Sequence, residues 1–173
     1  MLTQFEKIAH VKSLFPINLG TIITHYRPSI DEIVAIADII YHSEGKFIQP
    51  EDGIDLKFYG PKELLAPYNG DSIALLIETG TLIVGMGGSF LDEHPHEHNG
   101  HQRVEKECAA TLTSKLLGSN QDPLWRSIIR YAYQDDVGKR FDWHYLDASM
   151  TLPNLIKDAY TAKHDELSVL NDA

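Results

Sequence analysis

The 173-residue sequence is poor in cysteine, in basic residues and in long hydrophobic runs. Cys108 is its only cysteine, which excludes an intrachain disulfide and a zinc cluster built from several thiolates. Such usage is typical of a reducing compartment, so we expect a cytoplasmic protein. The longest apolar runs, 72–77 and 81–84, are the length of one strand, whereas a membrane span needs about 18 residues. We therefore expect no membrane partner, and the charged residues at positions 6, 7 and 12 predict no export signal.

Basic residues are few, because 15 Lys and Arg stand against 25 Asp and Glu, for a net charge of −10. This balance disfavours nucleic acid as a partner, since binding to it depends largely on Lys and Arg that neutralise phosphates. It favours a protein whose acidic groups hold cations. The length and the ordinary hydrophobic content predict a single domain over residues 1–173. The oligomeric state stays open, a homodimer included.

Hydrophobic patterns along the chain predict an α/β fold. Helical spacing indicates helices over about 3–15, 30–43, 104–117, 123–133 and 153–168. β-Branched or alternating runs indicate strands over 20–24, 55–59, 73–78 and 82–86. Because strands alternate with helices, we expect a single domain with a mostly parallel sheet and helices on both faces. Ligands of such sheets bind beyond the carboxyl ends of the strands, which is where three polar clusters fall.

The first polar cluster follows the strand at 20–24. His25 comes directly after that strand, and Asp31 opens the next helix. Metal sites often take a histidine and a carboxylate from such a turn. Ser29 and Glu32 have the spacing of a capping box, so we assign these two to helix capping. The helix dipole alone would also favour Asp31 in the first turn.

The second cluster is rich in histidine. Four of the nine histidines lie within eight residues, directly after Asp92 and Glu93. Neutral imidazoles and carboxylates are the usual ligands of Mn, Fe, Ni and Zn. A genuine metal site would recruit one or two of these histidines, and the alternative is a solvated polar loop. The four histidines are His94, His96, His98 and His101.

The third cluster lies at the end of the helix predicted over 123–133. Asp135 and Asp136 stand next to each other there, where acidic groups oppose the helix dipole unless a cation lies nearby. The alternative is a surface helix end that Gly138 closes.

The three clusters together resemble the motifs of the DHH phosphoesterase superfamily. Thr24-His25-x-x-Pro28-x-x-Asp31-Glu32 is similar to the first motif of that family, and Asp92-Glu93-His94-Pro95 to its Asp-His-His motif. The segment 107–112 is similar to the small-residue helix that follows, and Asp136 to the late metal-binding Asp. The stretch 84–88, Gln102 and the Asp136-Val-Gly ending also resemble the related melanocyte-proliferating-gene nuclease family. The resemblance covers about residues 20–140.

The resemblance implies hydrolysis of phosphoesters or phosphoanhydrides with a pair of Mn or Mg ions. Carried over residue by residue, His25, Asp31 and Asp136 would be metal ligands, and His94 would contact the metal or the phosphate. Asp92 and Glu93 of the third motif would complete the ligand set, since a glutamate also binds hard cations.

The sequence departs from the family pattern at three positions. Ser29 stands where the first motif has an Asp ligand, Gly85 takes the place of a bridging Asp, and Glu93 replaces the first His of the third motif. The usual C-terminal substrate-binding domain has no counterpart after Asp136. A second alignment matches 98–102 to the Asp-His-His-Gln of the nuclease family, which makes His101 the retained histidine and a reserve catalytic candidate beside His94.

Two functions are therefore expected from the sequence. The first is a divalent-metal-dependent phosphohydrolase that acts on a small phosphorylated molecule or a nucleotide, with one or two Mn or Mg ions. The alternative is a catalytically reduced relative that binds a metal or a nucleotide, or serves as an interaction module. The missing ligands favour the alternative, and the polar residues kept at all three clusters favour the hydrolase.

Overall fold

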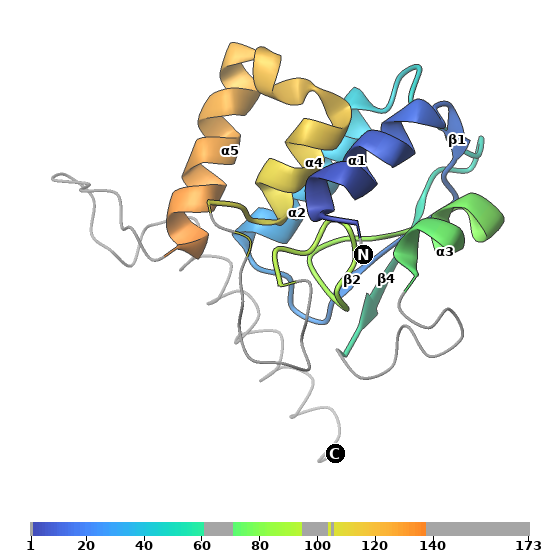
Figure 1. Ribbon diagram of the computed structural model, residues 1–173, viewed down its shortest axis with the longest axis horizontal. Helices are drawn as coiled ribbons and strands as arrows, with labels where there is room; N and C mark the ends of the chain where they lie inside the picture. Colours follow the sequence, from blue (N-terminus) through green and yellow to red (C-terminus); the bar gives the residue numbers. More distant parts are fainter. Residues whose placement is uncertain (1, 61–70, 95–103, 105, 138–173) are drawn as a thin grey trace, which may run out of the picture.

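The fold is seen in a computed structural model, which describes residues 2–60, 71–94, 104 and 106–137 (Figure 1). Its helices are α1 (Gln4–Ser13), α2 (Ile30–His42), α3 (Ser72–Thr79), α4 (Ala109–Leu117) and α5 (Pro123–Asp136), with a 3-10 turn, η2 (Ser119–Gln121). Its strands are β1 (Ile17–Asn18), β2 (Thr21–His25), β3 (Phe47–Ile48), β4 (Asp55–Tyr59) and β5 (Thr81–Ile83). The helix predicted over 153–168 lies outside the described residues.

Every strand pair in the described part of the chain is parallel. The main sheet has the order β4-β2-β5, and β1 pairs with β3 in a separate two-stranded sheet. The register places Ile22 beside Leu56 and Leu82, and Thr24 beside Phe58. This arrangement confirms the predicted α/β class with a mostly parallel sheet. No helix among the described residues is long and apolar enough to cross a bilayer.

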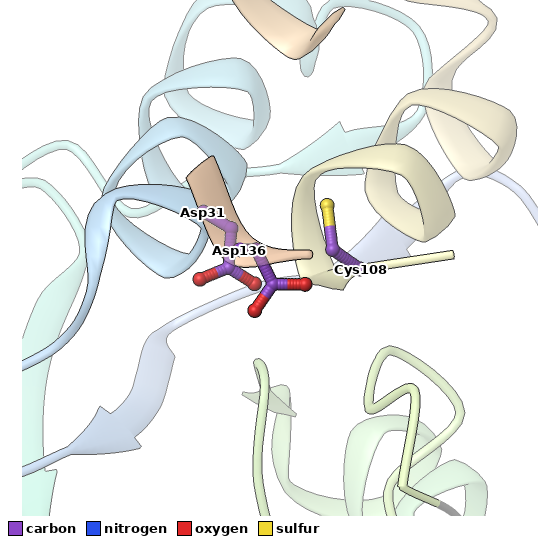
Figure 2. A group of neighbouring side chains, drawn as sticks. All are labelled: Asp31, Cys108 and Asp136. Atoms are coloured by element: carbon purple, nitrogen blue, oxygen red, sulfur yellow. The ribbon is translucent and has the colours of Figure 1, made fainter. Parts of the chain in front are cut away.

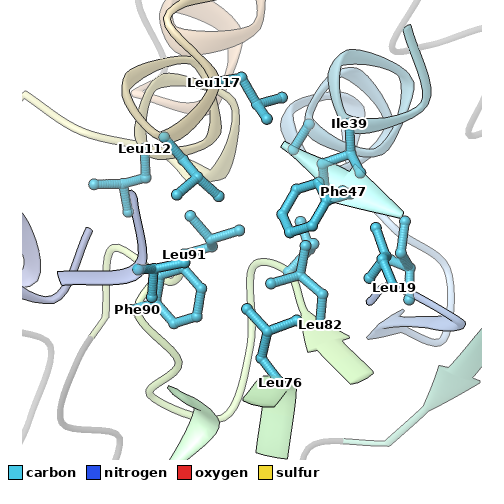
Figure 3. Packing of buried hydrophobic residues seen from close by; sticks show 14 of the residues in the cluster. Leu19, Ile39, Phe47, Leu76, Leu82, Phe90, Leu91, Leu112 and Leu117 are labelled. Atoms are coloured by element: carbon cyan, nitrogen blue, oxygen red, sulfur yellow. The ribbon is translucent and has the colours of Figure 1, made fainter. Parts of the chain in front are cut away.

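The main hydrophobic core lies between the sheet and the helices α1, α2 and α4, which gather on one side of it in Figure 1. α5 packs on α2 and α4 through a second buried cluster, which includes Trp125, Ile129 and Ala132. Ile22 and Leu82 point into the main core from neighbouring strands, and Phe90, Leu91 and Leu112 fill it (Figure 3). The alternate strand residues Ile23 and Ile83 point the other way, because successive side chains of a strand face opposite sides of a sheet. There they pack against Met86 and against Leu75 of α3.

The strand predicted over 73–78 is wrong, because that segment forms helix α3. A short apolar run has no periodicity that separates a buried strand from a buried helix, so its ends decide. Asp71 accepts hydrogen bonds from the amides of Ile73 and Ala74 at 3.1 and 3.0 Å and thereby caps the helix. Gly80 ends the helix in the left-handed conformation, and its amide donates to the carbonyl of Leu76.

Two other predicted elements are shorter in the structure. The helix expected from residue 104 begins only at Ala109, because Cys108 has an extended backbone and Lys106 a positive φ of 63°. The strand expected over 82–86 ends at Ile83, since Gly85 adopts a φ of 68° that breaks the extended conformation. As a result, Asp92 and Glu93 lie in the loop after β5, and Glu107 lies before the start of α4.

Candidate metal centre

The site lies at the carboxyl edge of the main sheet, as expected for a parallel α/β fold. β2 ends at His25 and leads to the first turn of α2, which carries Asp31 and Glu32. β5 ends at Ile83, and the loop that follows it reaches residue 94. Gln4 of α1 holds this loop, because its Nε2 donates to the carbonyls of Ser89 and Asp92 at 2.7 and 2.6 Å.

The first ligand group joins three helices. One carboxylate oxygen each of Asp31 and Asp136 and the Sγ of Cys108 all lie within 4.8 Å of one another. Asp31 comes from the start of α2, Asp136 from the end of α5, and Cys108 from the residue before α4 (Figure 2). Asp31 and Cys108 are buried, and Asp136 is half-buried. Asp31 also has a structural role, because its Oδ2 accepts a hydrogen bond from the Ala109 amide at the start of α4, at 3.1 Å.

The second ligand group belongs to the loop after β5. Asp92, Glu93 and His94 each offer one atom, and these atoms too lie within 4.8 Å of one another. The Asp92 carboxylate accepts from the amides of Gly88 and His94, both at 2.8 Å, so the backbone fixes its orientation. His94 Nδ1 lies 3.3 Å from Glu93 Oε1 and 3.7 Å from Asp92 Oδ1. The His94 side chain is 42% exposed, whereas the two acids are buried, so the imidazole forms the solvent rim of the group.

Electrostatic coupling links the two groups. Burial raises the pKa of Glu32 to about 7, and the negative charge of Asp31 and, more weakly, of Asp92 adds to the shift. Hydrogen bonds from Ser29 oppose it. Burial likewise raises the pKa of the Cys108 thiol to about 12, with contributions from Asp31 and Glu93. Acids from both groups therefore act on the same side chains, and each disfavours further negative charge near the others.

Glu32 packs against Gly85, the position that the family resemblance aligns with an aspartate. Gly85 faces this side chain so closely that a Cβ at position 85 would lie 2.4 Å from Glu32 Cγ and 2.9 Å from its Oε1. No side chain fits at position 85 without displacing Glu32.

The capping box predicted at the start of α2 is confirmed. Glu32 Oε2 accepts from the Ser29 amide at 2.6 Å, and the Ser29 hydroxyl contacts the carboxylates of both Asp31 and Glu32. Ser29 is therefore bound to two acidic side chains of the site. The residue that replaces a family ligand remains in contact with those acids.

The structure brings together most of the predicted site residues that it describes. Asp31 and Asp136 share one group, and Asp92, Glu93 and His94 share the other. His25 lies half-buried at the end of β2, and its Nε2 is buried with no hydrogen-bond partner among the described residues. His101, like His96 and His98, lies outside the described residues.

Sequence reasoning missed two residues of the site. Glu32 was assigned to the capping box, and Cys108 fell within the helix predicted over 104–117 without a role in the site. A signal existed for each, because Glu32 adjoins Asp31 and Cys108 comes between Glu107 and two small residues. Neither signal shows that Cys108 lies beside Asp31, which depends on the packing of α2 against α4.

Comparison of the chain with models of known protein families, with curated proteins and with solved structures gives no match. The resemblance to the DHH superfamily therefore rests on the motifs alone, and the geometry of the site carries the functional argument.

Proposed function

We propose that this protein is a divalent-metal-dependent phosphohydrolase that acts on a small phosphorylated molecule. The observation that carries the proposal is the convergence of Asp31 and Asp136, which are far apart in the sequence, beside the buried pair Asp92 and Glu93. Buried carboxylates repel one another strongly unless protons or a cation relieve the repulsion. A divalent cation would relieve this repulsion at the edge of the sheet where ligands of such folds bind.

The donor atoms fit a divalent ion. Carboxylate oxygens suit Mg and Mn, and an imidazole suits the later transition metals. Asp31 and Asp136 would hold an ion on the helix side, and Asp92 and Glu93 would hold one on the loop side. When bound, such ions polarise a phosphoryl oxygen and supply a nucleophilic water at neutral pH.

The residues of the chain would then position the substrate and handle the proton. His94 is the exposed member of its group, so a phosphate that enters from solvent meets its ring first. Glu93 Oε1 lies on the Nδ1 side of that ring at 3.3 Å, and this favours the tautomer with its proton on Nδ1. In that tautomer Nε2 is an acceptor, so it could take a proton from the attacking water. His94 would then serve as the group that moves this proton.

The test is an activity panel with matched variants. Chelator-stripped protein is assayed with Mn, Mg, Co and Ni on a generic phosphodiester and on a set of nucleotides. Asp31→Asn and Asp136→Asn should each lower the metal-dependent rate at least about 100-fold, because even partners of metal ligands cost 10–100-fold when they are removed. Asp55→Asn is the control, since its side chain is 61% exposed at the start of β4. Flat rates with every metal would overturn the hydrolase.

The binding module is the second candidate, and the crowding at Gly85 favours it. Gly85 supplies no carboxylate where the family resemblance aligns one, and Glu32 leaves no space for a side chain there. In that case the same protein should bind Mn or a nucleotide in calorimetry without turnover. Binding without turnover would select this candidate over the hydrolase.

A further inference from the structure

The thiol of Cys108 lies near the two carboxylates that the chain's distant halves contribute to the site. Its Sγ lies within 4.8 Å of an oxygen of Asp31 and an oxygen of Asp136, and the residue is fully buried. Figure 2 shows the three side chains next to one another, from the start of α2, the end of α5 and the residue before α4. This group therefore combines one soft sulfur donor with two hard oxygen donors.

Local hydrogen bonds fix the position of Cys108. Its backbone amide donates to Thr111 Oγ1 at 2.8 Å, and Thr111 Oγ1 in turn contacts Glu107 Oε2 at 2.7 Å. The next amide, that of Ala109, donates to Asp31 Oδ2. The Cys108 side chain takes part in a capping box with Thr111 and packs in a buried cluster with Trp125 and Ile129, although Ser, Thr, Asp or Asn is the preferred N-cap residue. The thiol thus has a structural role beside the two carboxylates.

We propose that Cys108 is a metal ligand together with Asp31 and Asp136, and that this ligand set selects a thiophilic divalent ion such as Zn or Co over Mg. The inference rests on the proposed function, because it concerns the same site. The sequence led us to expect Mn or Mg, which prefer oxygen donors, whereas a thiolate shifts the preference to softer ions. Binding forms a metal–sulfur bond, releases the thiol proton to solvent and displaces a water from the ion.

The spacing suits a site with an open position. Zinc ligands lie about 2.0–2.3 Å from the ion, which places tetrahedral donor atoms roughly 3.5 Å from one another. The donor atoms of this group lie within 4.8 Å of one another, so side-chain rotations that move them by about 1 Å would bring them to the separation of tetrahedral ligands. Three protein ligands leave the fourth tetrahedral position for water or substrate, which is the pattern of catalytic zinc sites.

The test uses the single cysteine of the chain. Co is added to the chelator-stripped full-length protein, and the near-ultraviolet spectrum is searched for a thiolate-to-cobalt charge-transfer band. Any such band in this protein must come from Cys108. Cys108→Ser should abolish the band while the protein stays folded, because serine is a good N-cap. The same change should weaken Zn binding at least about 100-fold and Mn binding less than about 10-fold, as expected for loss of one soft ligand.

The outcomes separate this inference from the proposed function. Co binding in calorimetry without a charge-transfer band would overturn the Cys108 assignment, and metal-dependent hydrolysis could still stand. A charge-transfer band in wild type that Asp136→Asn weakens would support the assignment, even where every phosphate substrate fails. An unchanged Zn affinity in a folded Cys108→Ser protein would also overturn it.

Discussion

Replacement of Asp31 by Asn tests whether a bound cation offsets the repulsion between the Asp31 carboxylate and the other acidic side chains of the site. Oxygens of Asp31 and Asp136 lie within 4.8 Å, and two unit charges at that distance repel by about 3.5 kcal/mol at an effective dielectric constant of about 20. Asparagine keeps an oxygen that can accept from the Ala109 amide but gives up the charge assistance of that bond, about 1 kcal/mol. The metal-free Asp31→Asn protein should therefore be about 2 kcal/mol more stable than metal-free wild type.

Thermal unfolding of the chelator-stripped proteins measures this difference. A gain of about 2 kcal/mol in a domain of this size corresponds to a rise in Tm of roughly 4–8 °C. Mn at about 100 times its dissociation constant should stabilise wild type by roughly 2.7 kcal/mol, and Asp31→Asn should lose most of that gain. One change thus raises the metal-free Tm and removes the metal response.

The exposed Asp55→Asn serves as the control, and both of its Tm values should stay near those of wild type. An equal Mn response in Asp31→Asn and wild type would place the ion elsewhere, for example on the exposed His94. A large loss of stability in metal-free Asp31→Asn would show that the cap on α4 outweighs the repulsion. Either result would refute the electrostatic reasoning.

Three further predictions concern single side chains. In metal-free protein, the free energy of unfolding should fall by roughly 3 kcal/mol as the pH rises from about 4.5 to about 7, because folded Glu32 keeps its proton up to about pH 7 whereas the unfolded chain loses it near 4.5. Glu32→Gln should remove this part of the pH profile in urea titrations, and an identical profile would contradict the raised pKa. Gly85→Ala should lower the free energy of unfolding more than Gly45→Ala. Both glycines have a φ near 70° (68° and 70°), but of the two only Gly85 faces another side chain within 4 Å. Equal losses would mean that Glu32 moves aside freely. Ser119→Ala should cost about 1–3 kcal/mol in denaturant unfolding, because Ser119 donates at 2.7 Å to the fully buried carboxylate of Asp38, and no loss would show that water replaces the hydroxyl.

The parts of the fold that the sequence predicted are those with strong local signals. A β-branched run indicates β2, and a capping box marks the start of α2. α5 opens with Asp122-Pro123, and the Asp122 carboxylate caps the helix. α3 could not be predicted in the same way, because its apolar run fits a strand as well as a helix. The apolar spacing of Ile33, Ile36 and Ile40 predicts one buried stripe on α2, and this prediction is wrong for Ile40, which is 51% exposed. α2 packs against the sheet, α4 and α5 together, which buries polar residues that periodicity assigns to solvent.

Some residues of the site could likewise be predicted from the sequence, and others could not. Asp31, Asp92, Glu93, His94 and Asp136 were chosen because carboxylates and histidine at strand and helix ends suit a cation and because the family resemblance implies such ligands, and the structure brings them into two groups. Glu32 had a sufficient local role in the capping box, so nothing in the sequence pointed to its second role over Gly85. Cys108 comes into the site because Lys106 turns the chain before α4 begins. Such backbone turns depend on tertiary packing and leave no periodic pattern.

The position of Asp136 in the last turn of α5 has a consequence for the dynamics of the chain. Helix ends fray, and their amides exchange with solvent faster than those of the helix centre. An ion held by Asp31 and Asp136 would join residues about 100 positions apart in the folded state, and its binding would stabilise that state by mass action. Metal occupancy would then be detectable far from any substrate, as slower hydrogen exchange at the Val137 amide, which donates to the carbonyl of Tyr133 at 3.0 Å. Hydrogen exchange in the final turn of α5 would thus show whether an ion is bound to both Asp31 and Asp136.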